Sequence, residues 1–203
     1  ICIDAHAKSR EEGSARKAQE LLDRMLNHDK KIAPPPDYVS FLSTMNAWAK
    51  CQQDPEAAEK AESLLHRMQQ LYQETGEPNL RPTASCYAVV LDAWSRRPDS
   101  GPKVESLLQE MEEELVKEIT SSSSQRPSDI EKQQSSLRAA GVETATTGGS
   151  AVKASYLAAI RAWGNTRTTD APERAERILL KLEEQAISGD GSRSTDMVLP
   201  CAK

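Results

Sequence analysis

The sequence predicts an all-α protein built from stacked helical hairpins, because two short patterns recur along the chain. One reads aromatic-x3-apolar-x-Ala-Trp, and the other, Ala/Val-x2-Leu/Ile-Leu-x2-Met/Leu, follows it at a similar distance. A repeat unit cannot bury its apolar face alone, so such units are expected to stack on their neighbours. A hydrophobic content of only 37% agrees with helices that each bury one stripe.

The first pattern predicts the first helix of each hairpin, because its apolar residues lie on one face of an α-helix. The three tryptophans are in phase with this stripe, so we expect them in the core and not as stacking platforms for bases. A truncated copy precedes three complete ones: Ile3, Ala5, His6; Phe41, Met45, Ala47, Trp48; Tyr87, Leu91, Ala93, Trp94; Tyr156, Ile160, Ala162, Trp163.

The second pattern predicts the second helix, again from a single apolar face. Turn-forming residues such as Gly13, Pro55 and Gly101 separate it from the first pattern, and Pro102 and Pro172 suit the first turn of a helix. Its four copies have identical spacing: Ala18, Leu21, Leu22, Met25; Ala61, Leu64, Leu65, Met68; Val104, Leu107, Leu108, Met111; Ala175, Ile178, Leu179, Leu182.

An insertion interrupts the third interval between repeats. Residues 119–150 contain no aromatic residue and carry runs of Ser, Thr and Gly near their ends. This composition cannot bury enough apolar surface to offset the entropy of ordering, so it predicts a disordered loop. The expected organisation is therefore repeats over 1–118, with the first truncated, the insertion over 119–150, a further hairpin over 151–188 and a flexible tail over 189–203.

Composition and motifs favour binding over catalysis. The net charge of −5 argues against a broad basic field but permits a local basic groove. The four cysteines lie far apart, without a C-x-x-C pair, and no recognised catalytic motif is present. We therefore expect no enzyme activity, no metal site, no cofactor and no small-molecule substrate. No apolar run approaches the roughly 20 residues that span a bilayer, so no membrane partner is expected.

The residue pattern of the repeats resembles that of the pentatricopeptide repeat family. The resemblance is carried by Ser40 to Lys50, by Ala61 to Met68, and by the unit ends Pro36-Asp37 and Pro82-Thr83. The tetratricopeptide opening is absent. The resemblance covers most of residues 1–184 outside the insertion and implies a right-handed α-solenoid. Compared with that family the units are long, and we expect the excess in loops, around 27–35 and 72–79.

The resemblance also implies single-stranded RNA as the ligand, bound on a concave face lined by the first helices, and residence in a mitochondrion or plastid. In the family, the residue after the aromatic and the residue that ends the unit select the base. Here these positions hold Leu42, Ala88 and Leu157, and Asp37 and Thr83. Leu and Ala side chains cannot hydrogen-bond a base edge, so we expect apolar contact without base selection.

A cation recurs near the end of the first helix, as Lys8, Lys50 and Arg96. Three in register would form a stripe able to hold phosphate. Each would equally stabilise the helix dipole from the C-terminal end, by roughly 0.3–1 kcal/mol. Both interpretations stay open at this point.

An alternative to RNA is a protein-interaction scaffold whose groove receives a peptide or a helix. The acidic balance and the absence of the base-selecting residues favour the scaffold, whereas the cations and the resemblance favour RNA.

Overall fold

The computed structural model describes residues 3, 13–27, 35–51, 54–122 and 147–189. This part of the chain contains seven α-helices, one short 3-10 helix and no strand, which confirms the all-α prediction for it. The helices are α2 (Ser14–Asn27), α3 (Tyr38–Lys50), α4 (Ala57–Thr75), η1 (Pro78–Leu80), α5 (Ala84–Ser95), α6 (Gly101–Ser122), α8 (Thr147–Gly164) and α9 (Ala171–Gly189).

The two sequence patterns correspond to two classes of helix. The first pattern lies on α3, α5 and α8, which we call the A helices, and the second lies on α2, α4, α6 and α9, the B helices. Each A helix is followed along the chain by its B helix, so α3/α4, α5/α6 and α8/α9 are hairpins.

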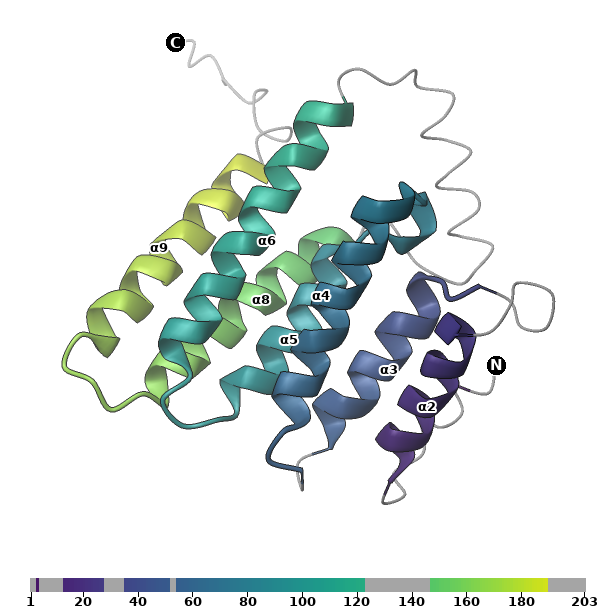
Figure 1. The fold of residues 1–203 in the computed structure, drawn as a ribbon. Helices are drawn as coiled ribbons and strands as arrows, with labels where there is room; N and C mark the ends of the chain where they lie inside the picture. The colour runs from purple at the N-terminus through teal and green to yellow at the C-terminus, as the bar shows by residue number, and fades with distance from the viewer. Residues whose placement is uncertain (1–2, 4–12, 28–34, 52–53, 123–146, 190–203) are drawn as a thin grey trace, which may run out of the picture.

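The hairpins lie side by side in chain order, from α2 at one end to α9 at the other (Figure 1). The A helices pack on one another, α3 on α5 and α5 on α8, and each B helix packs on the next A helix. The B helices of neighbouring hairpins approach each other less closely than the A helices do. Hairpins therefore touch mainly through the row of A helices, while long side chains connect the B helices.

The core is a seam between these helices, made of the repeated apolar residues. Phe41, Tyr87 and Tyr156 are buried, as are Trp48 and Trp163. Burial of these two tryptophans confirms their prediction as core residues.

Trp94 is only half-buried, and its Nε1 donates a hydrogen bond to Glu62 Oε2 at 3.1 Å. The corresponding nitrogens of Trp48 and Trp163 have no hydrogen-bond partner in the described structure.

Local chemistry sets the helix ends. Asp37 caps α3, because its Oδ1 accepts from the backbone N–H of Ser40 at 2.9 Å. Gly76 ends α4 with φ of 66°, a left-handed conformation that glycine adopts without strain. The expected excess loop around 72–79 is in part wrong, since α4 continues as helix through Tyr72 to Thr75.

The helices that flank the predicted insertion reach into it. Helix α6 ends at Ser122 and α8 begins at Thr147, so four residues at each end of 119–150 are helical. Residues 123–146 lie outside the described part, as do residues 190–203 of the predicted tail and the predicted site residue Lys8.

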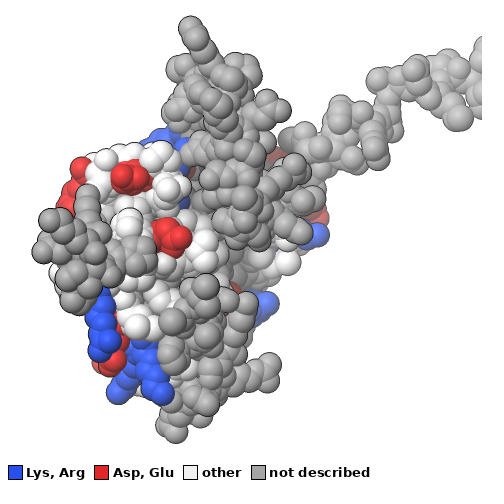
Figure 2. Space-filling view, turned by 90° about the vertical axis from the view of Figure 1, so that its right-hand side faces the viewer, with Lys and Arg blue, Asp and Glu red and all other residues white. Residues whose placement is uncertain are grey.

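The end of the stack formed by α2 carries its charges unevenly. Figure 2 views this end, and its Lys and Arg side chains gather mainly at the lower edge. Above them most of the described surface is uncharged, apart from a few acidic side chains. On this face the described residues form no continuous basic surface.

Candidate nucleic-acid interface

The predicted cations lie at the C-terminal ends of the A helices. Lys50 is the last residue of α3 and is exposed, and Arg96 is the residue that follows α5. In the third A helix the same repeat position holds Asn165, just after α8. Because α3, α5 and α8 pack in a row, these three side chains belong to one edge of the stack.

Two of these side chains join neighbouring A helices. Arg96 Nη1 donates to the carbonyl of Ala49 at 2.9 Å, and Asn165 Nδ2 donates to the carbonyl of Ser95 at 2.9 Å. Ala49 and Ser95 occupy the same repeat position, near the end of α3 and α5. Each donor therefore satisfies a terminal carbonyl of the preceding A helix, which has no partner within its own helix.

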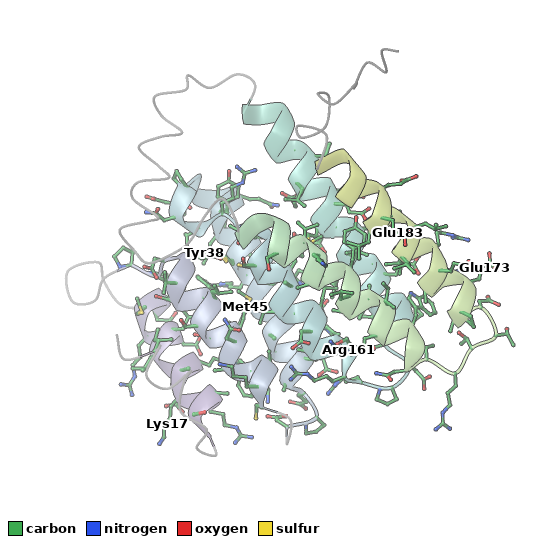
Figure 3. The ribbon with its side chains drawn as sticks, turned by 180° about the vertical axis from the view of Figure 1, so that it is seen from behind. Lys17, Tyr38, Met45, Arg161, Glu173 and Glu183 are labelled. Carbon is green, nitrogen blue, oxygen red and sulfur yellow. The ribbon has the colours of Figure 1, made fainter. Side chains whose placement is uncertain are left out.

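Asp92 lies between two arginines on this edge. It pairs with Arg96, which follows α5 one turn later, and its Oδ1 accepts from Arg161 Nη1 of α8 at 2.9 Å. Figure 3 shows Arg161 on α8, toward the neighbouring helix α5. Arg161 keeps about half of its side chain exposed, so it remains open to a ligand.

The three apolar positions after the aromatics differ in exposure. Leu42 and Ala88 are partly buried and pack against the core, whereas Leu157 is 45% exposed. The next A helix covers the first two, but α8 is the last described A helix, so nothing described covers Leu157. Apolar contact to a base is therefore most accessible at Leu157.

The two unit-end residues hold the fold in place. Asp37 caps α3, and its Oδ1 also accepts from the Ser40 hydroxyl at 2.6 Å. The Thr83 hydroxyl lies 3.0 Å from the Tyr38 hydroxyl, which connects the start of α3 to the start of α5. These contacts give both residues a structural role in the unliganded chain.

A second recurring feature escaped the sequence analysis. One residue before the first apolar position of each B helix is a cation, and in three copies it lies over the tryptophan of its own hairpin. Lys60 Nζ lies 4.6 Å from the ring centroid of Trp48, and Lys103 Nζ lies 6.0 Å from that of Trp94. Arg174 Cζ lies 5.3 Å from the ring centroid of Trp163. Such contacts contribute roughly 0.5–1 kcal/mol each at exposed sites. Alignment of the four B helices would have revealed these cations.

A pocket opens beside the turn between α3 and α4, lined by Arg16, Trp48, Cys51 and Asp54 among others. Asp54 accepts from Lys60 Nζ at 2.8 Å, and this hydrogen bond holds the carboxyl pKa below its usual value. The Asp54 carboxylate is therefore already engaged by Lys60. Within the described ranges no group of three His, Cys, Asp or Glu side chains could hold a metal ion.

No helix among those described is long and apolar enough to cross a membrane. Comparisons of the chain with models of protein families, with curated proteins and with solved structures found no match.

Proposed function

We propose that this chain binds single-stranded RNA along the row of A helices, through phosphate and shape and without reading the bases. The proposal combines the resemblance to pentatricopeptide repeats with the arrangement of the hairpins, which is compatible with an α-solenoid. In that arrangement the closely packed A helices would line the concave side, and the hand would be the right-handed one of the family.

An asymmetry of charge between the two rows of helices supports this proposal most directly. The A helices together with Arg96 carry four basic residues, Lys50, Arg96, Lys153 and Arg161, and one acidic residue, Asp92. The B helices carry more acidic residues, and a single one of them, α6, has six glutamates and two lysines. An acidic chain thus has a locally basic row of helices, as a phosphate-binding surface requires.

The roles within this surface follow from the contacts already made. Lys50 and Arg161 would bind phosphate first. Both arginines pair with Asp92, but Arg96 also donates to the carbonyl of Ala49 and is less exposed than Arg161. Leu157 and, less openly, Leu42 would contact bases through apolar surface. Side chains of this kind do not discriminate among bases, so affinity without sequence preference is expected.

The test is fluorescence anisotropy of labelled, randomised single-stranded RNA across a salt series. The wild-type chain is expected to bind saturably, with an affinity that falls as salt rises. Lys50→Glu/Arg161→Glu is expected to weaken binding by about tenfold or more, because two phosphate contacts become repulsive.

The matched control is Arg67→Glu/Arg177→Glu, which changes the net charge equally but on the exposed faces of the B helices α4 and α9. Its affinity is expected to stay within about threefold of wild type, since it leaves the A helices unchanged. Equal loss in both variants would show general charge attraction and overturn the placement on the A helices. Absence of binding at low salt by a folded chain would overturn RNA binding itself.

A protein scaffold is the second candidate. It is favoured by Asp92, whose carboxylate neutralises part of the positive charge of Arg96 and Arg161. With Asp92 pairing both arginines, the middle of the A row is less basic, while Val39 and Leu157 expose 38% and 45% of their surface. An apolar row with paired charges suits a peptide or a helix. Under this proposal Leu157→Asp would abolish partner capture by the chain, whereas Lys50→Glu/Arg161→Glu would leave it intact.

We also propose that the chain belongs to the pentatricopeptide repeat family and resides in a mitochondrion or plastid. Both rest on the residue pattern of the repeats. Imaging of the full-length protein, fused at its C-terminus to a fluorescent protein, tests the localisation directly, and a uniform cytosolic signal would contradict it.

A further inference from the structure

The carboxylate of Asp92 occupies N–H groups of two arginines from two different hairpins. Its Oδ2 pairs with Nη2 of Arg96, just after α5, and its Oδ1 accepts from Arg161 Nη1 of α8 at 2.9 Å. Arg161 Nη1 also lies 3.4 Å from the Ser95 hydroxyl oxygen. We call the packed contact between two neighbouring hairpins a joint. At the joint of α5 with α8, one carboxylate therefore engages both guanidinium groups.

This arrangement differs from the ion pairs between neighbouring B helices. There each cation faces a carboxylate of its own: Lys103 Nζ lies 2.6 Å from Glu62 Oε1, and Arg174 Nη1 lies 3.1 Å from Glu105 Oε2. Around Asp92 two cations share one acid, so the group keeps an excess of positive charge. Withdrawal of the carboxylate would leave both arginines without a counter-charge from the A helices, in whose residues Asp92 alone is acidic.

Packing of the A helices does not require an acid at this position. The equivalent of Asp92 in α3 is the uncharged Asn46, and α3 still packs on α5. A hydrogen bond to a terminal carbonyl of the preceding A helix recurs at both joints. The carboxylate is present at one of them only, so it is an addition to the contacts that hold the row together.

The group around Asp92 reaches the surface. The side chain of Asp92 is 37% exposed and that of Arg96 is 39% exposed, although α5 has a described A helix on each side. Arg96 is anchored by Nη1, which donates to the carbonyl of Ala49 at 2.9 Å, while its Nη2 faces the carboxylate. The Asp92 side chain can therefore turn into water and leave a guanidinium that is already in position.

A phosphodiester supplies the same kind of acceptor as this carboxylate. Each phosphate of an RNA backbone carries one negative charge and two non-bridging oxygens. Arginine binds carboxylates and phosphates through the same planar array of N–H donors. Because both anions need the same donors, Asp92 and a backbone phosphate exclude each other at Arg96 and Arg161.

We propose that Asp92 is a built-in competitor of the RNA backbone. In the free chain its carboxylate occupies Arg96 and Arg161, and on binding a phosphate takes over these donors while Asp92 turns to solvent. This inference rests on the RNA binding proposed above and adds the regulation of that site. The wild-type affinity is then lower than the two arginines alone would give.

Asp92→Asn tests the proposal, because it removes the charge with little change in shape. In the anisotropy titration with randomised single-stranded RNA, its affinity is expected to exceed that of wild type by about fivefold or more, since two surface ion pairs no longer oppose binding. The slope of log affinity against log salt should steepen by about 0.7, the value for one further phosphate neutralised on a single strand. The melting temperature of the free variant should fall, since the same two pairs are lost.

The matched control is Glu105→Gln. It also removes a carboxylate that pairs with an arginine of the next hairpin, and Glu105 is similarly exposed, at 32%, but lies on a B helix. Its affinity for RNA is expected to stay within about twofold of wild type, because salt screens charges away from the bound phosphate.

A second comparison uses the Arg96→Gln/Arg161→Gln chain. Without the two arginines, Asp92→Asn should raise the affinity no more than Glu105→Gln does in the wild-type chain. Circular dichroism and thermal unfolding confirm that each variant folds, and Asp92→Ser removes the carboxylate a second way.

The outcomes separate this proposal from RNA binding itself. If the wild-type chain binds RNA and Asp92→Asn binds no better than the control, the role of Asp92 is overturned while RNA binding stands. A gain that persists without both arginines also overturns it, because the carboxylate would then act by general repulsion. If neither the wild-type chain nor Asp92→Asn binds at low salt, RNA binding is overturned and this proposal with it.

Discussion

Lys103 of α6 lies with its ammonium 2.6 Å from the carboxylate of Glu62 on α4. The same carboxylate accepts the indole N–H of Trp94 from α5. Glu62 is nearly buried, whereas Lys103 is half exposed. One side chain thus connects three helices of two hairpins, and the hydrogen bond to the half-buried indole stabilises the joint more than the ion pair does.

Glu62→Ala is expected to lower the free energy of unfolding by about 1–3 kcal/mol, because it leaves the Trp94 nitrogen without its acceptor and Lys103 without its carboxylate. Glu62→Gln keeps an oxygen for Trp94 and should lose less. Urea denaturation of both variants measures the difference. An unchanged midpoint for Glu62→Ala would contradict the assigned role.

Gly101→Ala is expected to destabilise the chain, by about 1–3 kcal/mol for an overpacked site. A Cβ at this first residue of α6 would lie 2.6 Å from Cε3 of Trp163 and 2.8 Å from the Thr166 hydroxyl oxygen. The indole would have to move away from a core position in which it is 3% exposed.

The control is Gly164→Ala, where a Cβ meets nothing within 4 Å. That change should be neutral or slightly stabilising, since alanine restricts the unfolded chain. Thermal unfolding compares the two variants, and equal melting temperatures would contradict the predicted clash.

Tyr156→Phe is expected to cost about 1.5–3 kcal/mol of stability, the range for a hydrogen bond to a charged group. The Tyr156 hydroxyl donates to Glu112 Oε1 at 2.6 Å, and the residue is 1% exposed. Phe41 occupies the same repeat position in an earlier hairpin, where the residue equivalent to Glu112 is Leu26.

Phe41→Tyr is therefore expected to destabilise too, because it buries a hydroxyl opposite a repeat position that offers no acceptor side chain. Urea unfolding of Tyr156→Phe and of Phe41→Tyr tests whether each aromatic side chain suits the residue that faces it on the preceding B helix. A stabilised Phe41→Tyr chain would contradict this pairing of positions.

Stability is expected to fall as pH rises from about 9 to about 11. Burial raises the pKa of the Cys86 thiol from its ordinary 9.0 to about 11. Above pH 9 the unfolded chain therefore loses a proton that the folded chain retains, so deprotonation favours unfolding until the folded thiol also titrates. Burial also raises the pKa of Tyr38 and of Tyr87, which adds to the loss at alkaline pH.

Cys86→Ala removes the thiol and should fall less steeply in stability over the same pH range, although it starts lower because it leaves a small cavity. Urea midpoints between pH 7.5 and 10.5 give both slopes. Parallel slopes would show that Cys86 does not titrate differently in the folded chain.

Periodicity predicted the helices well, because burial of one stripe is a property of each helix alone. Phe41, Tyr87 and Tyr156 are all buried at the position that their pattern assigned. The end of α4 differs from the prediction, since a loop is expected around 72–79 but the helix continues to Thr75. A glycine marks a residue that a helix rarely passes, but composition does not show how close to that glycine the helix continues.

The candidate site was less predictable. The sequence predicts Arg96 in a row of phosphate-facing cations, yet its donor reaches a carbonyl 47 positions away in the chain. Asn165, at the same repeat position, reaches a carbonyl 70 positions away. Asp92 and Arg161 likewise come together only because α5 packs on α8. Spacing within one repeat carries no information about the distance to a carbonyl in the preceding repeat.

By itself the sequence determined which segments are helices, which face of each is apolar and which residues are equivalent among the copies, because these depend on local geometry repeated in every unit. Only the tertiary structure decided the partners of the charged residues and the exposure of equivalent leucines. Leu65 is buried and Leu179 is 43% exposed at one repeat position, since the first has a hairpin packed on it and the second does not. Burial and pairing belong to the joint between two units, and a joint exists only when the units are stacked.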